Sequence, residues 1–404
     1  MSSARQHYVI VGGGQAGGWA AKTLRDRGFA GRIVLLGEEE HLPHERPPLS
    51  KAVLLSGEVP PSLFLWPAEK LKELDIDLQL GARVVQIDRS KRELLRSDGS
   101  RVAYDRLLLA TGARPRKLSC PGVDLGGIHY LRTIADSLSI RRSLESEGRL
   151  LVVGGGWIGL EVAAAAVSMG RQVTLVEAGE QLCGRSLPKE SAAYFHAMHV
   201  ARGVDIRLNA RPTSFEGTGR VERVVFDDGS SLDISIAVIG IGVEPNVELA
   251  VGCGLAVDNG IVVDQATRSS DPTIFAAGDV ARHPAGPGGR MMRFESWQNA
   301  QNQGIVAAKA MLGDDVAHRD LPWFWSDQYD LNFQLVGIPS LSDRVLFKGD
   351  LQSGRFIQYF VDGPRLNAAA AFNSPRDLRE AKRIMLDNRP FDESGLSAMP
   401  HGPK

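Results

Sequence analysis

The sequence predicts an α/β fold with two parallel-sheet units and a C-terminal α+β region, and three observations lead to this prediction. An apolar strand runs into the pattern G-x-G-x-x-G near the start of the chain, in HYVIVGGGQAGGWAA. The same strand and pattern return in RLLVVGGGWIGLEVA, which begins at Arg149. From Leu321 onward the sequence changes to short alternating strands, among them PWFWSDQY, LNFQLVGI and RFIQYFV.

The three glycines of each copy have separate roles. The first permits a tight turn, the second lets the backbone approach a pyrophosphate, and the third lets the helix pack on the strand, so that the helix N-terminus faces the phosphates. In this order they are Gly12, Gly14 and Gly17 in the first copy and Gly154, Gly156 and Gly159 in the second. Two such Rossmann-type units in one chain predict two bound dinucleotides.

Each copy also has an acidic residue near the spacing that binds a ribose. Glu38 ends the strand RIVLLGE, 21 residues past Gly17, and Glu177 ends RQVTLVE, 18 residues past Gly159. A carboxylate at this spacing can accept hydrogen bonds from a ribose diol. Two complete strand-turn-helix-strand-acid units favour nucleotide binding over glycine-rich turns without function.

Composition narrows the class of protein. The formal net charge of −1 gives no overall reason to expect nucleic acid or a membrane as a partner. The three cysteines, Cys120, Cys183 and Cys253, lie far apart and form no C-x-x-C, so we expect no disulfide framework and no metal or iron–sulfur site. No apolar run approaches the roughly 18 residues of a membrane span, and no signal-peptide core follows MSSARQH. We expect a cytoplasmic protein.

Breaks in the pattern divide the chain into three domains, the first of them discontinuous. The strand YDRLLLATGARP ends at Thr111-Gly112, where a Pro-containing segment marks an exit into a second domain. The chain returns to the first domain in IVVDQATRSSDPTIFAAGDVA, which carries a strand ending in Gly278-Asp279. The predicted domains are 1–112 with 245–320, then 113–244, then 321–404. Further expected elements are helices over 68–74, 188–202 and 375–386, strands over 84–88, 92–95, 221–226 and 234–240, and a surface turn at AGPGG, 285–289.

These residues resemble the flavoprotein ferredoxin reductases that serve oxygenases and cytochromes P450. The matching segments are VGGGQAG, ERPPLSK, LLLATGARPR, LRT, GGGWIGLE, GIGVEPN, IFAAGD, ESWQNA and PWFWSDQYD, in the family's order and over nearly the whole chain. The resemblance implies a glutathione-reductase-like fold with FAD in the first domain, NADH in the second and a C-terminal domain covering the flavin. It also implies that NADH delivers a hydride to flavin N5 and that electrons then pass singly to a [2Fe–2S] ferredoxin.

The resemblance also suggests which residues hold FAD. Asp279 would accept hydrogen bonds from the ribityl hydroxyls, although a helix cap is the structural alternative. Glu38 would bind the ribose, and Val84 would offer a backbone contact beside the adenine, its side chain alone being typical of a core. Arg132 in LRT could neutralise a pyrophosphate, or lie on the surface in solvent. The other residues of this set are Gln15, Ala16, Arg46, Ala110, Thr111, Gly112 and Gly278.

Lys51 and Glu161 form the pair that we expect to tune the flavin. In the family the matching lysine lies near the isoalloxazine ring and pairs with the glutamate of GGGxIGLE. A cation there stabilises reduced, anionic flavin, and opposite charges in a partly dry cleft fix each other's ionisation. The alternative is a salt bridge between domains with no part in catalysis. No side chain needs to act as an acid or base in hydride transfer, because the cofactors carry the chemistry.

Glu177 should decide the nucleotide, because its carboxylate suits the ribose diol of NADH and would repel the 2′-phosphate of NADPH. Glu180 strengthens this bias, while Arg185 could contact phosphate or adenine. The remaining predicted contacts in this region are Ile158 and Gly242.

Three tryptophans are candidates for the flavin environment. Trp157 is a departure, since relatives commonly have a smaller aromatic or aliphatic residue there. It could stack on the flavin when no nucleotide is bound, or pack against the helix. Trp297 and Trp325 resemble positions that line the flavin, although each alone would be indistinguishable from core or interface packing.

Two other functions remain open at this point. The enzyme could reduce a small molecule such as oxygen, a quinone or an ascorbate radical, or the chain could be a binding protein resembling apoptosis-inducing factor. ESWQNA followed by PWFWSDQYD favours the ferredoxin reductase, and the lack of a long C-terminal insertion counts against the binding protein. The segment EEEHLPHERPPLSKAVLLSGE has no cysteine, so a thiol shuttle of the disulfide-reductase kind is not expected.

Two basic stretches could dock an acidic ferredoxin. Arg282, Arg290 and Arg293 surround the turn PAGPGG, with Glu295 the only acid between 282 and 309. The helix from Pro375 adds Arg376, Arg379, Lys382 and Arg383, diluted by Asp377 and Glu380. The alternative is that both stretches are ordinary solvated surface.

Overall fold

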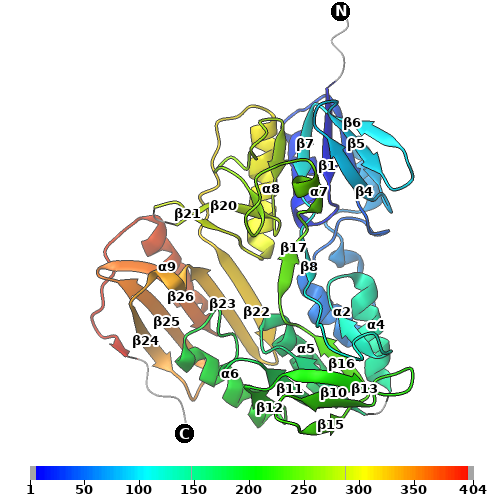
Figure 1. The fold of residues 1–404 in the computed structure, drawn as a ribbon. Helices are drawn as coiled ribbons and strands as arrows, with labels where there is room; N and C mark the ends of the chain where they lie inside the picture. The colour runs from blue at the N-terminus through cyan, green and yellow to red at the C-terminus, as the bar shows by residue number, and fades with distance from the viewer. Residues whose placement is uncertain (1–5, 147, 287, 399–404) are drawn as a thin grey trace, which may run out of the picture. The chain divides into compact units, whose positions relative to one another are not determined.

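The computed structural model describes residues 6–146, 148–286 and 288–398 (Figure 1). These residues form two compact units, each assembled from three separated stretches of chain. Within the described residues, unit 1 comprises 6–45, 60–114 and 244–322, and unit 2 comprises 46–59, 115–243 and 323–398. The chain passes between the units five times, and two of these crossings lie within β8 (Ala113–Pro115) and β17 (Val243–Pro245).

Unit 1 is built on a five-stranded parallel sheet with the order β19-β7-β1-β2-β3. Its central strand, HYVIV, is apolar throughout because both of its faces are covered. Tyr8 and Ile10 pack toward the helical side, whereas Val9 and Val11 pack toward the opposite layer. The strands are β1 (His7–Val11), β2 (Arg32–Leu36), β3 (Ile76–Gln79), β7 (Arg106–Leu109) and β19 (Ile274–Ala276).

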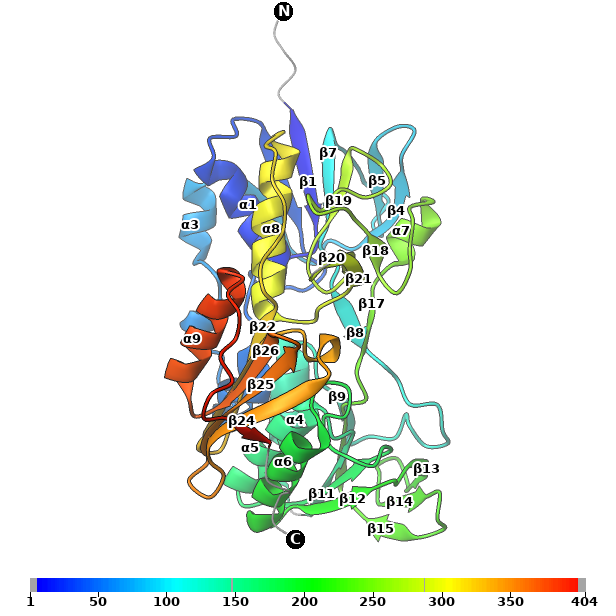
Figure 2. The ribbon, with the colours of Figure 1, turned by 90° about the vertical axis from the view of Figure 1, so that its left-hand side faces the viewer.

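Two helices, α1 (Gln15–Asp26) and α8 (Trp297–Met311), lie side by side on the helical face of this sheet (Figure 2). The two helices lie so close together that a Cβ atom on Gly304 would be 2.3 Å from the carbonyl oxygen of Ala16. Only glycine, which has no Cβ atom, permits this approach. An antiparallel three-stranded sheet, β4-β5-β6, covers the opposite face. The remaining elements of unit 1 are α3 (Ala68–Glu73), β4 (Val84–Asp88), β5 (Glu93–Arg96), β6 (Arg101–Ala103), α7 (Glu248–Gly252), β18 (Ile261–Val262), β20 (Ala281–Ala285), β21 (Arg290–Met292) and the 3-10 turn η2 (Pro61–Leu63).

Unit 2 repeats the same plan in its middle stretch. Its parallel sheet has the order β12-β11-β10-β16-β9, and a small antiparallel sheet, β13-β14-β15, covers one face. The elements are β9 (Ile128–Tyr130), α4 (Ile134–Glu145), β10 (Arg149–Val153), α5 (Trp157–Ser168), β11 (Gln172–Glu177), α6 (Lys189–Ala201), β12 (Asp205–Leu208), β13 (Pro212–Glu216), β14 (Arg223–Phe226), β15 (Ser231–Asp233) and β16 (Ile236–Ile239). A short segment, η1 (Pro47–Ser50) with α2 (Ala52–Ser56), packs on α4 and α5.

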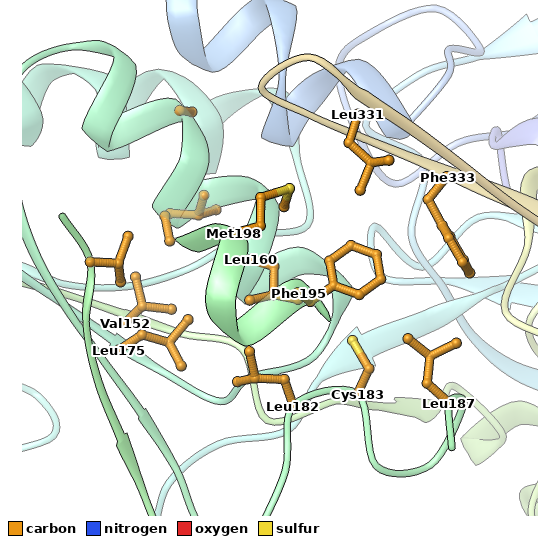
Figure 3. Packing of buried hydrophobic residues seen from close by; sticks show 14 of the residues in the cluster. Val152, Leu160, Leu175, Leu182, Cys183, Leu187, Phe195, Met198, Leu331 and Phe333 are labelled. Atoms are coloured by element: carbon orange, nitrogen blue, oxygen red, sulfur yellow. The ribbon is translucent and has the colours of Figure 1, made fainter. Parts of the chain in front are cut away.

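The C-terminal stretch of unit 2 is an antiparallel sheet with the order β22-β23-β26-β25-β24-β27. It shares one hydrophobic core with α5 and α6: Phe333 of this sheet lies near Phe195, and Leu160 and Val152 continue the same cluster (Figure 3). The elements are β22 (Trp323–Gln328), β23 (Leu331–Gly337), η3 (Pro339–Leu341), β24 (Arg344–Asp350), β25 (Arg355–Asp362), β26 (Arg365–Phe372), α9 (Pro375–Leu386) and β27 (Ser397–Ala398).

The predicted α/β class with two nucleotide-fold units and a C-terminal α+β region is confirmed, and several predicted element boundaries are corrected. The helix over 375–386 and the strand over 84–88 have the expected bounds. β2 ends at Leu36, two residues before Glu38, and the chain bends from Glu38 onward. The predicted strand over 221–226 begins only at Arg223, and residues 46–59 group with unit 2. None of the described helices has both the length and the apolar character needed to cross a membrane.

Candidate cofactor sites

The first glycine pattern forms a close-packed cradle at the start of α1. Gly12 has φ +118°, and a Cβ atom there would lie 2.0 Å from the carbonyl oxygen of Ala110. A Cβ atom on Gly17 would lie 1.9 Å from the carbonyl oxygen of Gly12, so the helix could not sit this close to β1 with any larger residue. At Gly14, by contrast, a Cβ atom would meet no atom of the described chain within 4 Å.

The second pattern repeats this geometry in unit 2. Gly154 has φ +106°, and a Cβ atom would lie 2.4 Å from the carbonyl oxygen of Gly240. A Cβ atom on Gly159 would lie 2.0 Å from the carbonyl oxygen of Gly154, while one on Gly156 would face open space. The first and third glycines are therefore required by packing, and the second opens the backbone to whatever lies outside it.

In each pattern the helix begins directly after the second, open glycine. Gly14 is the N-cap of α1 and Gly156 is the N-cap of α5, and neither N-terminus receives a hydrogen bond from a capping side chain. The first backbone N–H groups of each helix therefore point outward, as binding to an anion requires. The residues present fit the pyrophosphate of a dinucleotide at each of the two sites.

Glu38 and Asp279 lie at strand ends in unit 1. The Glu38 side chain is 70% exposed, and Arg83 Nε lies 3.5 Å from its Oε1. Asp279 follows Gly278, which has φ +83°, in the turn after β19. The described helix that follows has Ser296 as its N-cap, so Asp279 is not its cap and that alternative loses its support.

Other predicted residues of unit 1 are held by specific contacts. With its amide oxygen facing the indoles, Gln15 accepts hydrogen bonds from Trp19 Nε1 at 3.2 Å and from Trp297 Nε1 at 3.0 Å. Thr111 Oγ1 donates to the carbonyl of Asn246 at 2.8 Å. Gly112 has φ +67°, Ala16 packs beside Gly278, and the side chain of Val84 is buried in the core, as its apolar character indicated.

Lys51 and Glu161 meet in unit 2. Lys51 Nζ lies 2.7 Å from Glu161 Oε2, and the Glu161 side chain is 3% exposed. Lys51 lies between η1 and α2, whereas Glu161 lies one turn into α5. Since both residues belong to one unit, the pair is not a bridge between the two compact units.

Two hydroxyl groups that sequence reasoning missed complete the environment of Glu161. Ser50 Oγ donates to Oε2 at 2.5 Å and Ser326 Oγ donates to Oε1 at 2.6 Å. Three donors therefore hold a buried carboxylate, which is how a buried charge is accommodated. A signal for Ser326 was present, because WSDQ places Ser326 and Gln328 two apart and so on the same face of the strand.

Arg46 and Arg132 also come together in unit 2. An Nη atom of Arg46 donates to the carbonyl oxygen of Arg132 at 2.6 Å. The backbone N–H of Arg132 donates to Asp136 Oδ2 at 3.0 Å, beside the capping box that starts α4. The backbone of Arg132 is therefore fixed by both neighbours.

Glu177 ends β11, and its carboxylate already supports the glycine turn. Oε2 accepts a hydrogen bond from the Gly155 N–H at 2.7 Å, and Oε1 accepts one from the Gly179 N–H at 2.8 Å. Glu180 is exposed nearby in sequence. The guanidinium of Arg185 lies against Gly242, which has φ +100°.

Trp157 packs into an aromatic cluster of unit 2. Its ring stacks on Phe333, with centroids 4.9 Å apart and planes 20° apart, and it meets Phe195 and Phe324 edge-on. Of the two roles predicted for Trp157, the structure supports packing. Ile158 beside it is 44% exposed, and Trp325 stacks on Trp323 with centroids 5.1 Å apart.

The arginines predicted to dock a ferredoxin differ in how exposed they are and in whether an acidic residue pairs with them. Arg282 is paired with Asp258, and the Arg293 side chain is 7% exposed and lies 2.9 Å from Glu295. Asp258 and Glu295 offset the charges of Arg282 and Arg293, and the docking role of these arginines stays a prediction. Arg290 is exposed at the start of β21. On α9, Arg383 pairs with Glu380, while Arg376 and Arg379 are exposed.

Comparison with known proteins identifies relatives over nearly the whole chain. A family described as pyridine nucleotide-disulphide oxidoreductase matches residues 6–304, and one described as reductase C-terminal matches residues 323–399. The chain is 42% identical to rhodocoxin reductase of Rhodococcus erythropolis, over 95% of this chain and 90% of that protein. It is 38% identical to putidaredoxin reductase of Pseudomonas putida, over 98% of this chain and 95% of that protein.

Solved structures agree with these relatives. The putidaredoxin reductase in a covalent complex with putidaredoxin superposes with a TM-score of 0.93 at 38% identity, covering 96% of this chain and 94% of that one. The ferredoxin reductase of the CYP199A2 system from Rhodopseudomonas palustris superposes equally well, at 37% identity over 96% of both chains. The predicted resemblance to ferredoxin reductases and the glutathione-reductase-like fold are thereby confirmed. The chain belongs to the pyridine nucleotide-disulphide oxidoreductase family.

Proposed function

We propose that this protein is an FAD-dependent NADH:ferredoxin reductase that supplies single electrons to a [2Fe–2S] ferredoxin, which in turn serves an oxygenase or a cytochrome P450. The observation that carries the proposal is the repeated glycine cradle, in which the same three glycines are packed, open and packed at the starts of α1 and α5. Two open, uncapped helix N-termini fit two dinucleotides. The names of the relatives, which include ferredoxin–NAD(+) reductase components of dioxygenase systems, supply the acceptor.

The bound FAD would accept a hydride from NADH and pass the electrons on one at a time. In unit 1, the N-terminus of α1 would hold the FAD pyrophosphate, while Glu38 and Asp279 would accept hydrogen bonds from ribose and ribityl hydroxyls. In unit 2, the N-terminus of α5 would hold the NADH pyrophosphate, and Glu177 would bind the adenosine ribose.

Lys51 would place its ammonium beside the isoalloxazine ring and raise the flavin's midpoint potential. Glu161, with Ser50 and Ser326, would hold that ammonium in place and carry its counter-charge. Neither residue transfers a proton in this scheme, because hydride transfer between the two cofactors needs no side-chain acid or base.

Electrons would pass from the flavin to the ferredoxin without a thiol intermediate. Residues 38–58, where a thiol shuttle would lie, contain no cysteine. Burial raises the pKa of the Cys183 thiol, which makes it a poor nucleophile. A cytoplasmic location is part of the proposal, since three free thiols suit a reducing compartment.

The purified protein tests this function in two stages. It should release FAD rather than FMN on denaturation, and one equivalent of NADH should bleach the flavin anaerobically. It should then reduce putidaredoxin, the ferredoxin partner of a relative, or another [2Fe–2S] ferredoxin in a steady-state assay. Recovery of FMN would contradict the FAD site, and a flavin that NADH reduces but that passes electrons only to oxygen or a quinone would make the small-molecule reductase the better description.

A further inference from the structure

A continuous chain of hydrogen bonds leads from Glu161 into the core of unit 2. Ser326 Oγ, which donates to Glu161 Oε1, accepts a hydrogen bond from Gln328 Nε2 at 3.0 Å. The other end of the same amide, Gln328 Oε1, lies 2.8 Å from His199 Nε2. The Tyr329 hydroxyl lies 3.2 Å from His199 Nδ1. Four side chains beyond Glu161 are thus linked in series.

The side chains in the middle of this hydrogen-bonded series have no access to water. Ser326 and Gln328 are each 1% exposed, and His199 is fully buried. A buried polar group that loses its hydrogen-bond partner carries the full cost of desolvation. The stability of each side chain in the series therefore depends on the next one. The three groups come from two elements, because β22 places Ser326 and Gln328 on one face and α6 brings His199 to them.

The directions of the hydrogen bonds are fixed by chemistry. Gln328 gives its N–H to Ser326, so its oxygen must accept from His199, and His199 therefore carries its proton on Nε2. Its Nδ1 is then an acceptor, to which the Tyr329 hydroxyl donates. Because Gln328 occupies a lone pair of Ser326, the hydroxyl proton of Ser326 points at Glu161. All the donors in the series point toward the carboxylate, and such chains strengthen one another.

This series holds one oxygen of Glu161, and Lys51 and Ser50 share the other. Oε2 lies 2.7 Å from Lys51 Nζ and accepts the hydrogen bond of Ser50 Oγ, while Ser326 fixes Oε1, the end of the carboxylate that Lys51 and Ser50 do not hold. Burial lowers the pKa of His199 to about 4, so the imidazole is neutral near pH 7 and adds no charge to the series.

We propose that Gln328 and His199 are positioning residues that orient Ser326 and Glu161 and thereby hold the Lys51 ammonium in the place where it acts on the flavin. The inference rests on the proposed function, because Lys51 is given its role there. Neither Gln328 nor His199 touches the reacting atoms in this scheme.

The test compares variants that remove the series with one that rebuilds it. His199→Phe and Gln328→Met keep the volume but break the hydrogen bonds, whereas His199→Gln can donate to Gln328 and accept from Tyr329. Ser191→Ala is the matched control. Ser191 lies on α6 like His199 and donates to the buried Gln358, so its loss also breaks a buried hydrogen bond to the C-terminal sheet, but this bond does not lead to Glu161.

Three measurements separate positioning from packing. They are the flavin midpoint potential, the rate of anaerobic flavin reduction by NADH in stopped flow, and the ¹⁵N chemical shifts of the His199 imidazole, which report its tautomer in the oxidised holoprotein. We expect wild-type His199 to be protonated on Nε2. His199→Phe and Gln328→Met should lower the potential and slow reduction by about tenfold, which corresponds to ~1.4 kcal/mol, in the same direction as Lys51→Gln. His199→Gln should recover most of the rate, and Ser191→Ala should lose only thermal stability.

Three outcomes would contradict the proposal, and they can be told apart. If Lys51→Gln shifts the potential and the rate while His199→Phe and Gln328→Met shift neither, the positioning proposal is wrong and the proposed function stands. If Lys51→Gln itself has no effect, the role of Lys51 falls, and the positioning proposal falls with it. A His199 tautomer protonated on Nδ1 would also overturn the proposal, because the series would then point the other way.

Discussion

The carboxylate of Glu177 accepts a hydrogen bond from the backbone N–H of Gly155, with 2.7 Å between the two atoms. The acid that is expected to bind a ribose is therefore also the support of the glycine turn in front of it. The other oxygen of Glu177 accepts from the Gly179 N–H at 2.8 Å, so its negative charge stays at the edge of the turn. A phosphate brought to this place meets a fixed like charge.

Glu177 should make the enzyme prefer NADH to NADPH. A desolvated clash between like charges is worth about 2 to 4 kcal/mol, or roughly 30- to 1000-fold in kcat/KM. Glu177→Gln removes the charge and keeps an oxygen for one of the two backbone N–H groups, so the ratio of kcat/KM for the two nucleotides should fall to less than about tenfold. Steady-state kinetics with both nucleotides measure the ratio.

Glu180→Gln is the control for this prediction, because Glu180 is exposed and no hydrogen bond to the turn is described for it. It should change the ratio only slightly, and by less at high salt, because exposed charges are screened. Equal use of NADH and NADPH by the unmodified protein would contradict the role given to Glu177.

Substitutions at two glycines of the first pattern should affect folding and cofactor binding separately. A methyl group on Gly14 would enter open space, so Gly14→Ala should fold with nearly unchanged stability yet bind FAD poorly. A methyl group on Gly17 would overlap the carbonyl oxygen of Gly12, so Gly17→Ala should unfold at lower temperature even without cofactor. Thermal unfolding of the apoproteins and the FAD content after purification measure the two effects. Full flavin content in Gly14→Ala would argue against a pyrophosphate at this turn.

Much of the fold could be predicted from the sequence because its signals are local. Apolar strands, glycine turns and helix starts such as the Pro375 of α9 are set by neighbouring residues, and α9 has the expected bounds. The grouping of 46–59 with 115–243 could not be predicted, because it depends on contacts between residues far apart in sequence. The sequence predicts Glu38 as the end of its strand, although the sheet pairing ends at Leu36.

The candidate site was predictable where a motif carried it and not elsewhere. Lys51 and Glu161 came from a resemblance, and the structure joins them. Ser50 and His199 carry no pattern in the sequence that distinguishes them from other serines and histidines. Their partners become visible only when η1 and α6 pack against α5 and β22.

Trp157 should contribute to stability more than to hydride transfer. Its ring packs on Phe333, Phe195 and Phe324, and truncating a large, half-buried aromatic side chain costs about 2 to 3 kcal/mol. Trp157→Ala should therefore lower the free energy of unfolding by about that amount in urea titrations. Trp157→Phe, which keeps part of the stack, should lose less. A large change in the rate of flavin reduction with unchanged stability would favour the gating role instead.

His283 should make the protein less stable in acid. It is 2% exposed and packs against His318, and burial followed by the nearby His318 charge lowers its pKa from 6.5 to about 4. The unfolded chain therefore binds a proton that the folded one does not between these pH values. Stability should be unaffected by this group above about pH 6.5 and fall toward pH 4, by about 3 kcal/mol in all. Urea unfolding across this range should show a smaller fall in His283→Leu, and an equal fall would exclude His283 as the cause.

The ferredoxin should be attracted by Arg290. Exposed charges at the rim of an interface mainly steer the encounter, so the rate of ferredoxin reduction should fall as added salt shortens the Debye length from about 30 to about 8 Å. Ferricyanide reduction should change far less. Arg290→Glu should reproduce the effect of salt at low ionic strength, because Arg290 is exposed at the start of β21.

The matched control is Lys72→Glu, which makes the same change of charge at an exposed position on α3. If the total charge of the protein mattered, Lys72→Glu and Arg290→Glu would slow the ferredoxin equally. If the place of the charge matters, only Arg290→Glu slows it. A ferredoxin rate indifferent to salt and to Arg290→Glu would instead indicate an apolar docking surface, and the reductase activity would not depend on this basic turn.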